Sequence, residues 1–262
     1  MGNGSSGNMA IEAVTGIAIL SGKGGVGKSV ISLNLALSMG SLGVRTLLFD
    51  AACGDLINLA NLGYPDAGID KSCLYNLTDN VDLNSPAAPD SYSVHDESDL
   101  EDFLAEIARF ASGYRCVIFD CPSGTGPIAY MLAGLSEMSI IVSTPDPTSI
   151  AGAYLLAKSL YFDGLARRCG ILFNQVDSAD QAASLQTKFN LLTRQFLHHE
   201  FEHVGHIHSD IRLAESVLEQ QPLLLESTKS VSSIDIINLA EKLCQNSGFQ
   251  FETGDLKSHS GQ

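Results

Sequence analysis

Short apolar runs alternate with longer stretches of helical spacing along most of the chain. Runs rich in Val, Ile and Phe predict buried strands, at residues 14–20, 44–49, 116–119, 139–142, 170–173 and 203–207. The stretches between them predict helices, at residues 29–39, 98–111, 147–162, 178–198, 210–219 and 231–244. Strands that are apolar on both faces and separated by helices form parallel sheets covered on both sides. We therefore expect one α/β domain with a mostly parallel sheet of about seven strands and helices on both faces.

The two ends of the chain are polar. Residues 1–13 start with a Gly-, Ser- and Asn-rich segment without the basic stretch of a signal peptide. This composition is typical of a flexible leader or a cloning remnant. Residues 247–262 predict a polar, frayed tail. The folded domain is therefore expected to span residues 14–246.

The overall charge limits the classes of partner. The 262 residues include 30 Asp and Glu against 15 Lys and Arg, a net charge of −15. Such a chain is not expected to bind DNA or anionic lipid through bulk charge. No apolar run approaches the roughly 20 residues of a membrane span, and six cysteines without a C-x-x-C pair do not indicate a disulfide scaffold. These features predict a cytoplasmic protein.

Acidic residues are concentrated in one part of the chain. Residues 72–108 contain nine acidic side chains and no Lys or Arg. The part at 79–97 is rich in Asp, Ser, Asn and Pro, which predicts an irregular surface excursion. A solvated loop is the simpler interpretation, and a docking surface for a basic partner is the alternative.

The strongest motif follows the first predicted strand and opens a helix. It satisfies G-x-x-x-x-G-K-[ST], the phosphate-binding P-loop, over Gly22, Lys23, Gly24, Gly25, Val26, Gly27, Lys28 and Ser29. Its backbone N–H groups and the helix N-terminus can hold phosphate oxygens. Lys28 is expected to bridge the β- and γ-phosphates, and the Ser29 hydroxyl to bind Mg²⁺. The predicted cofactors are ATP or ADP with Mg²⁺.

Two further positions match the switch regions of P-loop ATPases. Asp120 ends a predicted strand, where an Asp assists Mg²⁺ binding, and Gly124 fits the D-x-x-x-G spacing that brings a backbone N–H to the γ-phosphate. Asp50 also follows a predicted strand, and the carboxyl ends of parallel strands form the ligand-binding edge. Ser29, Asp50 and Asp120 are therefore the predicted metal-site residues.

The P-loop resembles that of a particular family. A second lysine, Lys23, gives the form Lys-Gly-Gly-Val-Gly-Lys-Ser, which resembles the deviant Walker A motif of the MinD/ParA (SIMIBI) group of P-loop NTPases. In that group this lysine reaches the nucleotide of a partner subunit. The resemblance implies an ATP-dependent homodimer, with Lys23, Lys28 and Asp50 as catalytic residues.

Later segments resemble the FlhG/FleN flagellar-number regulators within this group. The run at 143–150 and the element Asn174-Gln175-Val176 match their motifs, and Asn174 is implied to contact adenine. Residues 205–210 resemble the loop that covers the base and ends in Asp210, although His208 replaces its proline. The resemblance implies a spatial or number switch whose partners are proteins, such as flagellar or other polar machinery.

One departure from the family concerns hydrolysis. Asp50 matches the first Asp of the switch I D-x-D element, but the second, which orients the attacking water, is replaced by Ala52. An alanine cannot hold a water, so hydrolysis is expected to be slow or absent unless Asp55 substitutes. The alternatives are a nucleotide-responsive adaptor without useful ATPase activity and a ParA-like partitioning ATPase, which the negative charge disfavours.

Two other departures concern partners. Residues 1–13 have no D-Q-A-x-x-L-R element, and the similar string at 180–186 is interpreted as a helix start. The last predicted helix has a single basic residue between 234 and 244, Lys242. We expect it to pack on the sheet, so the C-terminus gives no support for membrane binding.

Histidine and cysteine residues suggest further chemistry that the pattern does not favour. His199 and His203 have the i,i+4 spacing of a metal-binding helix, but residues 204–207 match a strand of the family, which breaks that helical face. Cys53, Cys116 and Cys121 lie near the switch regions and are expected to act as small apolar residues.

Overall fold

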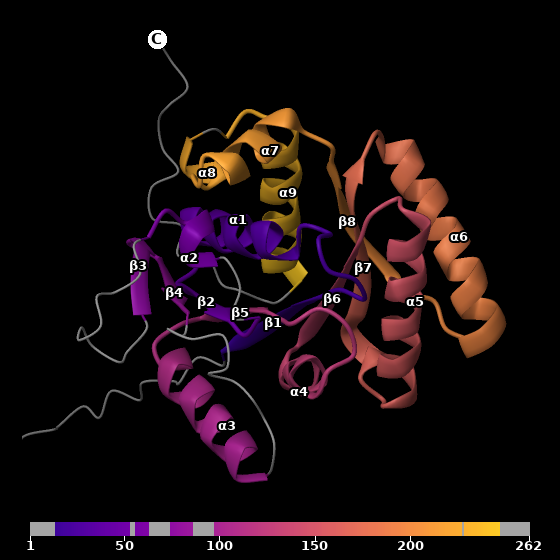
Figure 1. Ribbon diagram of the computed structural model, residues 1–262, viewed down its shortest axis with the longest axis horizontal. Coiled ribbons are helices and arrows are strands. Elements are labelled where there is room, and N and C mark those ends of the chain that lie inside the picture. The colour runs from indigo at the N-terminus through magenta and orange to yellow at the C-terminus, as the bar shows by residue number, and fades with distance from the viewer. Residues whose placement is uncertain (1–13, 53–55, 63–73, 86–96, 227, 247–262) are drawn as a thin grey trace, which may run out of the picture.

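One eight-stranded sheet, in the order β3-β4-β2-β5-β1-β6-β7-β8, organises the computed structural model (Figure 1). The structure describes residues 14–52, 56–62, 74–85, 97–226 and 228–246. Every neighbouring pair is parallel except β3 and β4, which are antiparallel. The strands are β1 (Thr15–Leu20), β2 (Thr46–Asp50), β3 (Leu74–Thr78), β4 (Val81–Asn84), β5 (Cys116–Asp120), β6 (Met138–Ser143), β7 (Cys169–Val176) and β8 (Glu202–His208).

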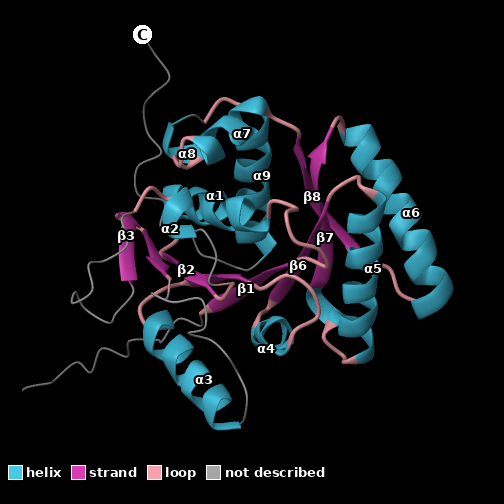
Figure 2. Ribbon diagram, in the orientation of Figure 1, coloured by secondary structure: helices cyan, strands magenta, loops and turns pink. Residues whose placement is uncertain are grey.

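Helices cover both faces of the sheet (Figure 2). One face carries α1 (Lys28–Ser41), α2 (Leu56–Leu59), α7 (Ile211–Leu218), α8 (Leu223–Glu226) and α9 (Val231–Asn246). The other carries α3 (Glu97–Ala111), α4 (Pro127–Leu135), α5 (Pro147–Phe162) and α6 (Ala179–Leu197), with a short 3₁₀ helix at Ala166–Arg168. The expected α/β fold with a mostly parallel, doubly covered sheet is confirmed.

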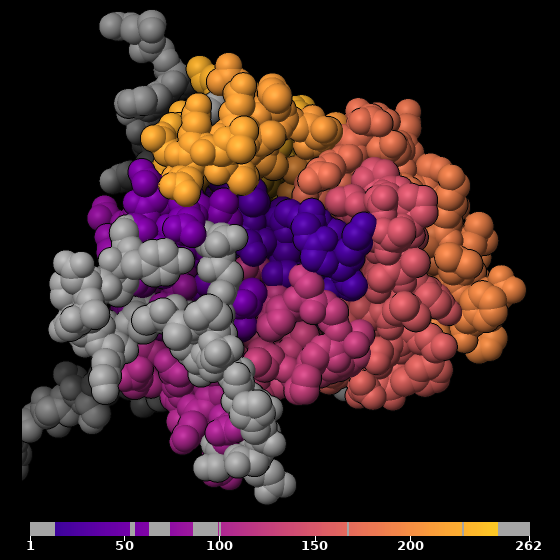
Figure 3. Space-filling view, in the orientation of Figure 1, coloured from indigo at the N-terminus to yellow at the C-terminus, as the bar shows by residue number. Residues whose placement is uncertain are grey.

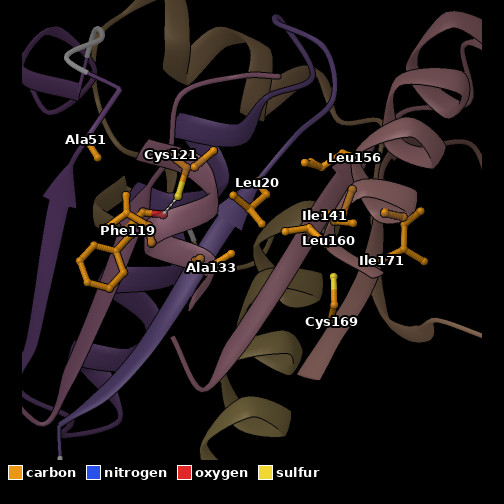
Figure 4. Close-up of a cluster of buried hydrophobic side chains, with 14 of the residues drawn as sticks. Leu20, Ala51, Phe119, Cys121, Ala133, Ile141, Leu156, Leu160, Cys169 and Ile171 are labelled. Atoms are coloured by element: carbon orange, nitrogen blue, oxygen red, sulfur yellow. Dashed lines mark hydrogen bonds between the residues drawn. The ribbon is translucent and has the colours of Figure 1, made fainter. Parts of the chain in front are cut away.

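Each face of the sheet has its own hydrophobic core. The core under α1 and α9 contains Ile19, Leu35 and Leu239. The core on the other face is shown in Figure 4, where Leu20, Ile141 and Ile171 of adjacent strands lie beside Leu156 and Leu160 of α5. Central strands buried on both faces explain the continuous apolar runs in the sequence.

The sequence interpretation missed β3, β4 and α4. Residues 79–97 were expected to form an irregular excursion, and this is wrong for β4, whose four residues are all buried. Asp82 of β4 accepts hydrogen bonds from Arg45 and Tyr114, so one of the nine acidic residues is paired in the interior. A short buried strand that carries Asp and Asn has the composition of a surface loop, so its hydrophobic pattern does not indicate a strand. The part at 86–96 lies outside the described residues.

The expected packing of the last helix, the helix start at 180–186 and the burial of Cys116 and Cys121 are confirmed. Helix α9 packs on α1 and β8, and no helix in the described part of the chain is long and apolar enough to cross a membrane. The string at 180–186 starts α6, whose N-cap Ser178 accepts a hydrogen bond from the Gln181 N–H. Cys116 and Cys121 are buried, and burial raises the pKa of both thiols. Cys53 and the terminal segments 1–13 and 247–262 lie outside the described residues.

Candidate functional site

The P-loop connects the carboxyl end of β1 to α1, at the centre of one face of the molecule (Figure 3, indigo). Gly27 is the N-cap of α1 and has φ +86°, a left-handed conformation that favours glycine. Because glycine has no side chain to cap the helix, the first-turn N–H groups of α1 are free to donate hydrogen bonds to an external anion. Lys23, Gly24 and Gly25 are exposed on the same loop.

Lys28 and Asp120 form a buried ion pair behind this loop. Nζ of Lys28 lies 2.9 Å from Oδ1 of Asp120, and the two side chains are 7% and 0% exposed. The Ser32 hydroxyl also donates to Oδ1, at 3.2 Å. Oδ2 of Asp120 is buried without a hydrogen-bond partner among the described residues. Burying an unpaired carboxylate oxygen is costly, so this atom is suited to an additional ligand.

Asp50 lies next to Asp120 at the same edge of the sheet. The two residues are register partners on β2 and β5, and Asp50 is fully buried, with Oδ2 accepting a 2.8 Å hydrogen bond from the Ser85 hydroxyl. Ala52 follows two residues later and is half-buried. Asp55, the candidate substitute for the second Asp of the D-x-D element, lies outside the described residues.

These groups fit a magnesium ion. Mg²⁺ prefers carboxylate and hydroxyl oxygens and keeps several waters. The structure supplies the orphan Oδ2 of Asp120 and the Asp50 carboxylate on adjacent strands, and the half-buried Ser29 in the first turn of α1. The predicted metal residues therefore come from three elements that meet at the carboxyl edge of the sheet.

A close glycine–glycine contact positions the start of the P-loop. A Cβ atom added to Gly22 would lie 2.0 Å from the carbonyl oxygen of Gly152 in α5, and one added to Gly152 would lie 2.9 Å from that of Gly22. Neither position can take a larger residue without backbone movement. Gly152 was not singled out from the sequence, because nothing in a helical pattern shows which glycine meets a distant loop.

Lys23 is held by residues at the start of α5. Its Nζ donates to Thr148 Oγ1 and lies 3.3 Å from Oδ1 of Asp146, with the lysine and aspartate side chains about half exposed. Asp146 is the N-cap of α5 and accepts hydrogen bonds from the Thr148 and Ser149 N–H groups. The Thr148 hydroxyl also donates to Asp146. This side-chain hydrogen bond and the one from the Ser149 N–H lower the pKa of Asp146 to about 2. Lys23 therefore has a partner within its own chain, which the sequence did not predict.

Gly124 lies near the P-loop, but its N–H is already used. It donates to the carbonyl oxygen of Ser21 at 2.7 Å, and its φ of +92° requires glycine. Contact with a γ-phosphate, as predicted from the D-x-x-x-G spacing, would therefore need this hydrogen bond to break.

Asn174 joins the end of β7 to the P-loop. Its Nδ2 donates to the carbonyl oxygen of Val26 at 2.8 Å, and its Oδ1 accepts from the Gln175 N–H. A Cβ atom on Gly27 would lie 2.5 Å from the same Nδ2. The residue expected to contact adenine thus lies directly against the phosphate-binding loop.

A cavity of about 170 Å³ opens beside Asn174, and its lining includes Gly27, His208 and Asp210. Oδ1 of Asp210 accepts from the Arg212 N–H, and Oδ2 accepts from the Ser232 N–H and hydroxyl. Partial burial acts to raise the pKa of Asp210, but these hydrogen bonds outweigh it and lower the pKa. Asp210 therefore connects the start of α7, through Arg212, to the start of α9, through Ser232, at the wall of the cavity.

Two larger cavities lie elsewhere. They measure about 360 and 460 Å³ and share Glu137 and Arg168, at the amino ends of the strands. Neither is lined by a P-loop residue. In parallel sheets ligands bind at the carboxyl ends of the strands, so the smaller cavity beside the P-loop is the better candidate for a nucleotide base.

Comparison with known sequences agrees with this geometry. Residues 17–223 match the CobQ/CobB/MinD/ParA nucleotide binding domain family. The chain is 26% identical over 249 residues to the antiactivator FleN of Pseudomonas aeruginosa, covering 89% of this chain and 88% of that protein. It is also 32% identical over 157 residues to the flagellum site-determining protein YlxH of Helicobacter pylori, covering 54% of this chain and 52% of that protein.

Comparison with solved structures supports the fold. The septum site-determining protein MinD of Pyrococcus horikoshii, complexed with Mg-ADP, superposes with a TM-score of 0.69 at 22% identity. The match covers 90% of this chain and 98% of that one. At this level of identity the likeness extends to the architecture of the sheet and its helices.

Proposed function

Because the chain belongs to the CobQ/CobB/MinD/ParA nucleotide binding domain family, we propose that it is an ATP-binding switch of the MinD/ParA type. Its ATP-bound form is a homodimer, and dimerisation exposes a surface for a protein partner. ATP shifts the protein from monomer to dimer only if it binds the dimer more tightly than the monomer.

The observation that carries the proposal is the buried Lys28–Asp120 pair with the orphan Oδ2 of Asp120. Lys28 supplies a cation behind the uncapped N-terminus of α1, where phosphate oxygens bind. Asp120, Asp50 and Ser29 hold Mg²⁺, which neutralises negative charge on the phosphates when bound. The adenine enters the cavity beside Asn174, whose volume suits a flat ring but is below the roughly 300 Å³ of a whole ligand site.

Hydrolysis is slow in this proposal. Positioning the attacking water is a large part of phosphoryl-transfer catalysis, and Ala52 has no group that can do so. Slow turnover prolongs the ATP-bound dimer.

The biological role that we propose is a spatial or number switch similar to that of FleN and YlxH. The net charge of −15 favours protein partners over DNA. Within the acidic segment at 72–108, the exposed Glu101 and Asp102 of α3 are the first residues to test for contact with such a partner.

The dimer is tested by size-exclusion chromatography with light scattering, with ATP, ADP or no nucleotide. We expect the wild type to be a dimer with ATP and a monomer with ADP or without nucleotide. Lys23→Ala should be a monomer in all three conditions. Lys188→Ala, which removes an exposed lysine from α6, is the matched control and should still dimerise. A wild-type monomer in every nucleotide state would refute the sandwich dimer.

A second candidate function, an adaptor that binds nucleotide without useful hydrolysis, is favoured by Ala52. Phosphate release by the wild type and by Ala52→Asp separates the two. Release that rises about tenfold or more in Ala52→Asp indicates an ATPase limited by water positioning. Fast release by the wild type that is abolished in Asp55→Ala would exclude the adaptor and assign the missing role to Asp55.

A further inference from the structure

Three potential metal ligands from β8 and α9 lie close together outside the P-loop. They are His206, His208 and Asp235, all half-buried, and one ligand atom from each lies within 4.8 Å of the others. Nδ1 of His208 is 2.8 Å from Oδ2 of Asp235. The rings of His206 and His208 meet edge to face, with centroids 4.9 Å apart.

The local fold explains why these side chains converge. The register between β7 and β8 shifts between His203 and Gly205, and again between Ile207 and His208, where the extra residue, Gln175, is on β7. Strand β8 itself continues without an inserted residue from Gly205 to His208. His206 and His208 are two residues apart on this strand, so their side chains leave the same face. The pair His199 and His203 considered from the sequence is divided between a loop and the strand, so the strand period brings a different pair of histidines together.

Asp235 is fixed independently of any ligand. Its Oδ2 accepts hydrogen bonds from both the backbone N–H of His208 and the Nδ1 of the same residue, at 2.9 and 2.8 Å. It belongs to the first turns of α9, which packs on β8. The carboxylate therefore stays beside the imidazole without further ordering cost, as expected of a prepared ligand set.

From this geometry we propose that His206, His208 and Asp235 bind a divalent transition-metal ion of the Zn²⁺ class. Two imidazoles and one carboxylate form a donor set that suits Zn²⁺, Co²⁺ or Ni²⁺ and disfavours Mg²⁺, which prefers oxygen ligands. Tetrahedral ligands about 2.0–2.2 Å from a metal are roughly 3.4 Å apart, so small side-chain rotations close the site. The ion replaces the His208–Asp235 hydrogen bond, and His208 then carries its proton on Nε2.

The location separates this site from the predicted magnesium site but not from the nucleotide cavity. His208 also lines the 170 Å³ cavity that contains Gly27 and Asp210. An ion on His208 would therefore lie at the wall of the space that we assign to adenine. Its binding does not depend on the proposed ATP function, because all three ligands come from β8 and α9.

The test is a titration of the untagged full chain with Co²⁺, without nucleotide and in the presence of excess Mg²⁺. We expect one equivalent of Co²⁺ to give visible d–d absorption, which Zn²⁺ then abolishes by displacement. His206→Ala and Asp235→Asn should weaken binding on the order of 100-fold. His199→Ala removes a histidine from the same stretch but outside the cluster, and should leave the titration unchanged.

Circular dichroism of each variant separates loss of a ligand from loss of fold. His208→Ala also removes the hydrogen bond to Asp235, so it cannot separate ligand loss from structural loss. His206→Ala is the deciding variant, because the His206 ring makes ring contacts with His203 and His208. Absence of Co²⁺ absorption at excess metal in the folded wild type, or unchanged binding in folded His206→Ala, overturns the proposal.

Discussion

Nζ of Lys28 lies 2.9 Å from Oδ1 of Asp120, and this ion pair between α1 and β5 is buried. Removing one partner leaves the other charge buried without compensation. We expect Lys28→Met to abolish ATP binding and to lower the free energy of unfolding by about 3–5 kcal/mol. Urea denaturation and titration with a fluorescent ATP analogue measure the two effects.

The double variant Lys28→Met, Asp120→Asn distinguishes structure from function. Without the buried charge on residue 120, the stability should largely return, whereas ATP binding should stay lost. A double variant as unstable as the single one would show that the carboxylate charge is not the source of the destabilisation.

The contact between Gly22 and Gly152 predicts a packing effect on the nucleotide site. In Gly152→Ala the new Cβ would lie 2.9 Å from the Gly22 carbonyl oxygen, which displaces the P-loop. Overpacking of this kind costs about 1–3 kcal/mol, so nucleotide affinity should fall by roughly tenfold or more. In Gly134→Ala, the control in α4, the Cβ would be 3.6 Å from Leu165, and affinity should not change.

Asp146, the N-cap of α5, predicts that the stability of the fold decreases at acid pH. Hydrogen bonds from Thr148 and Ser149 lower the pKa of Asp146 to about 2, below its value in the unfolded chain. The stability that the ionised Asp146 contributes is therefore present above pH ~4 and is lost as the pH falls toward 2. The difference in melting temperature between the wild type and Asp146→Asn should shrink over this window. Lys23→Ala, which removes an exposed partner of Asp146, should have little effect on melting.

Tyr114 predicts that the free energy of unfolding falls at alkaline pH, whereas Asp146 predicts a fall at acid pH. Burial and the 2.6 Å hydrogen bond to Asp82 raise the pKa of Tyr114 to about 12. A raised pKa in the folded state contributes stability below pH ~10 that is lost as the pH rises toward 12. Relative to Tyr114→Phe, the wild type should lose about 1–2 kcal/mol over this window in urea denaturation. Parallel curves for the two proteins would contradict the prediction.

The fold was predictable where burial and sequence pattern agree. The central strands β1, β2, β5, β6 and β7 are almost entirely buried, so most of their residues are apolar and the polar ones lie mainly near the strand ends. The pattern failed at β4, because Asp82 is buried through its pairing with Arg45 and Tyr114, which are distant in sequence. It failed again at α4, which is a short helix in which Pro127 is the first residue.

The sequence by itself determined the P-loop, because this motif is local: Gly27 supplies a left-handed backbone conformation and Lys28 begins α1 in the same turn. It also placed Asp50 and Asp120 at strand ends. Only the tertiary structure decided the partners of these groups. Gly152 contacts Gly22, Asp146 pairs with Lys23, and Asp235 pairs with His208, because packed helices and strands bring together residues whose separation along the chain has no period.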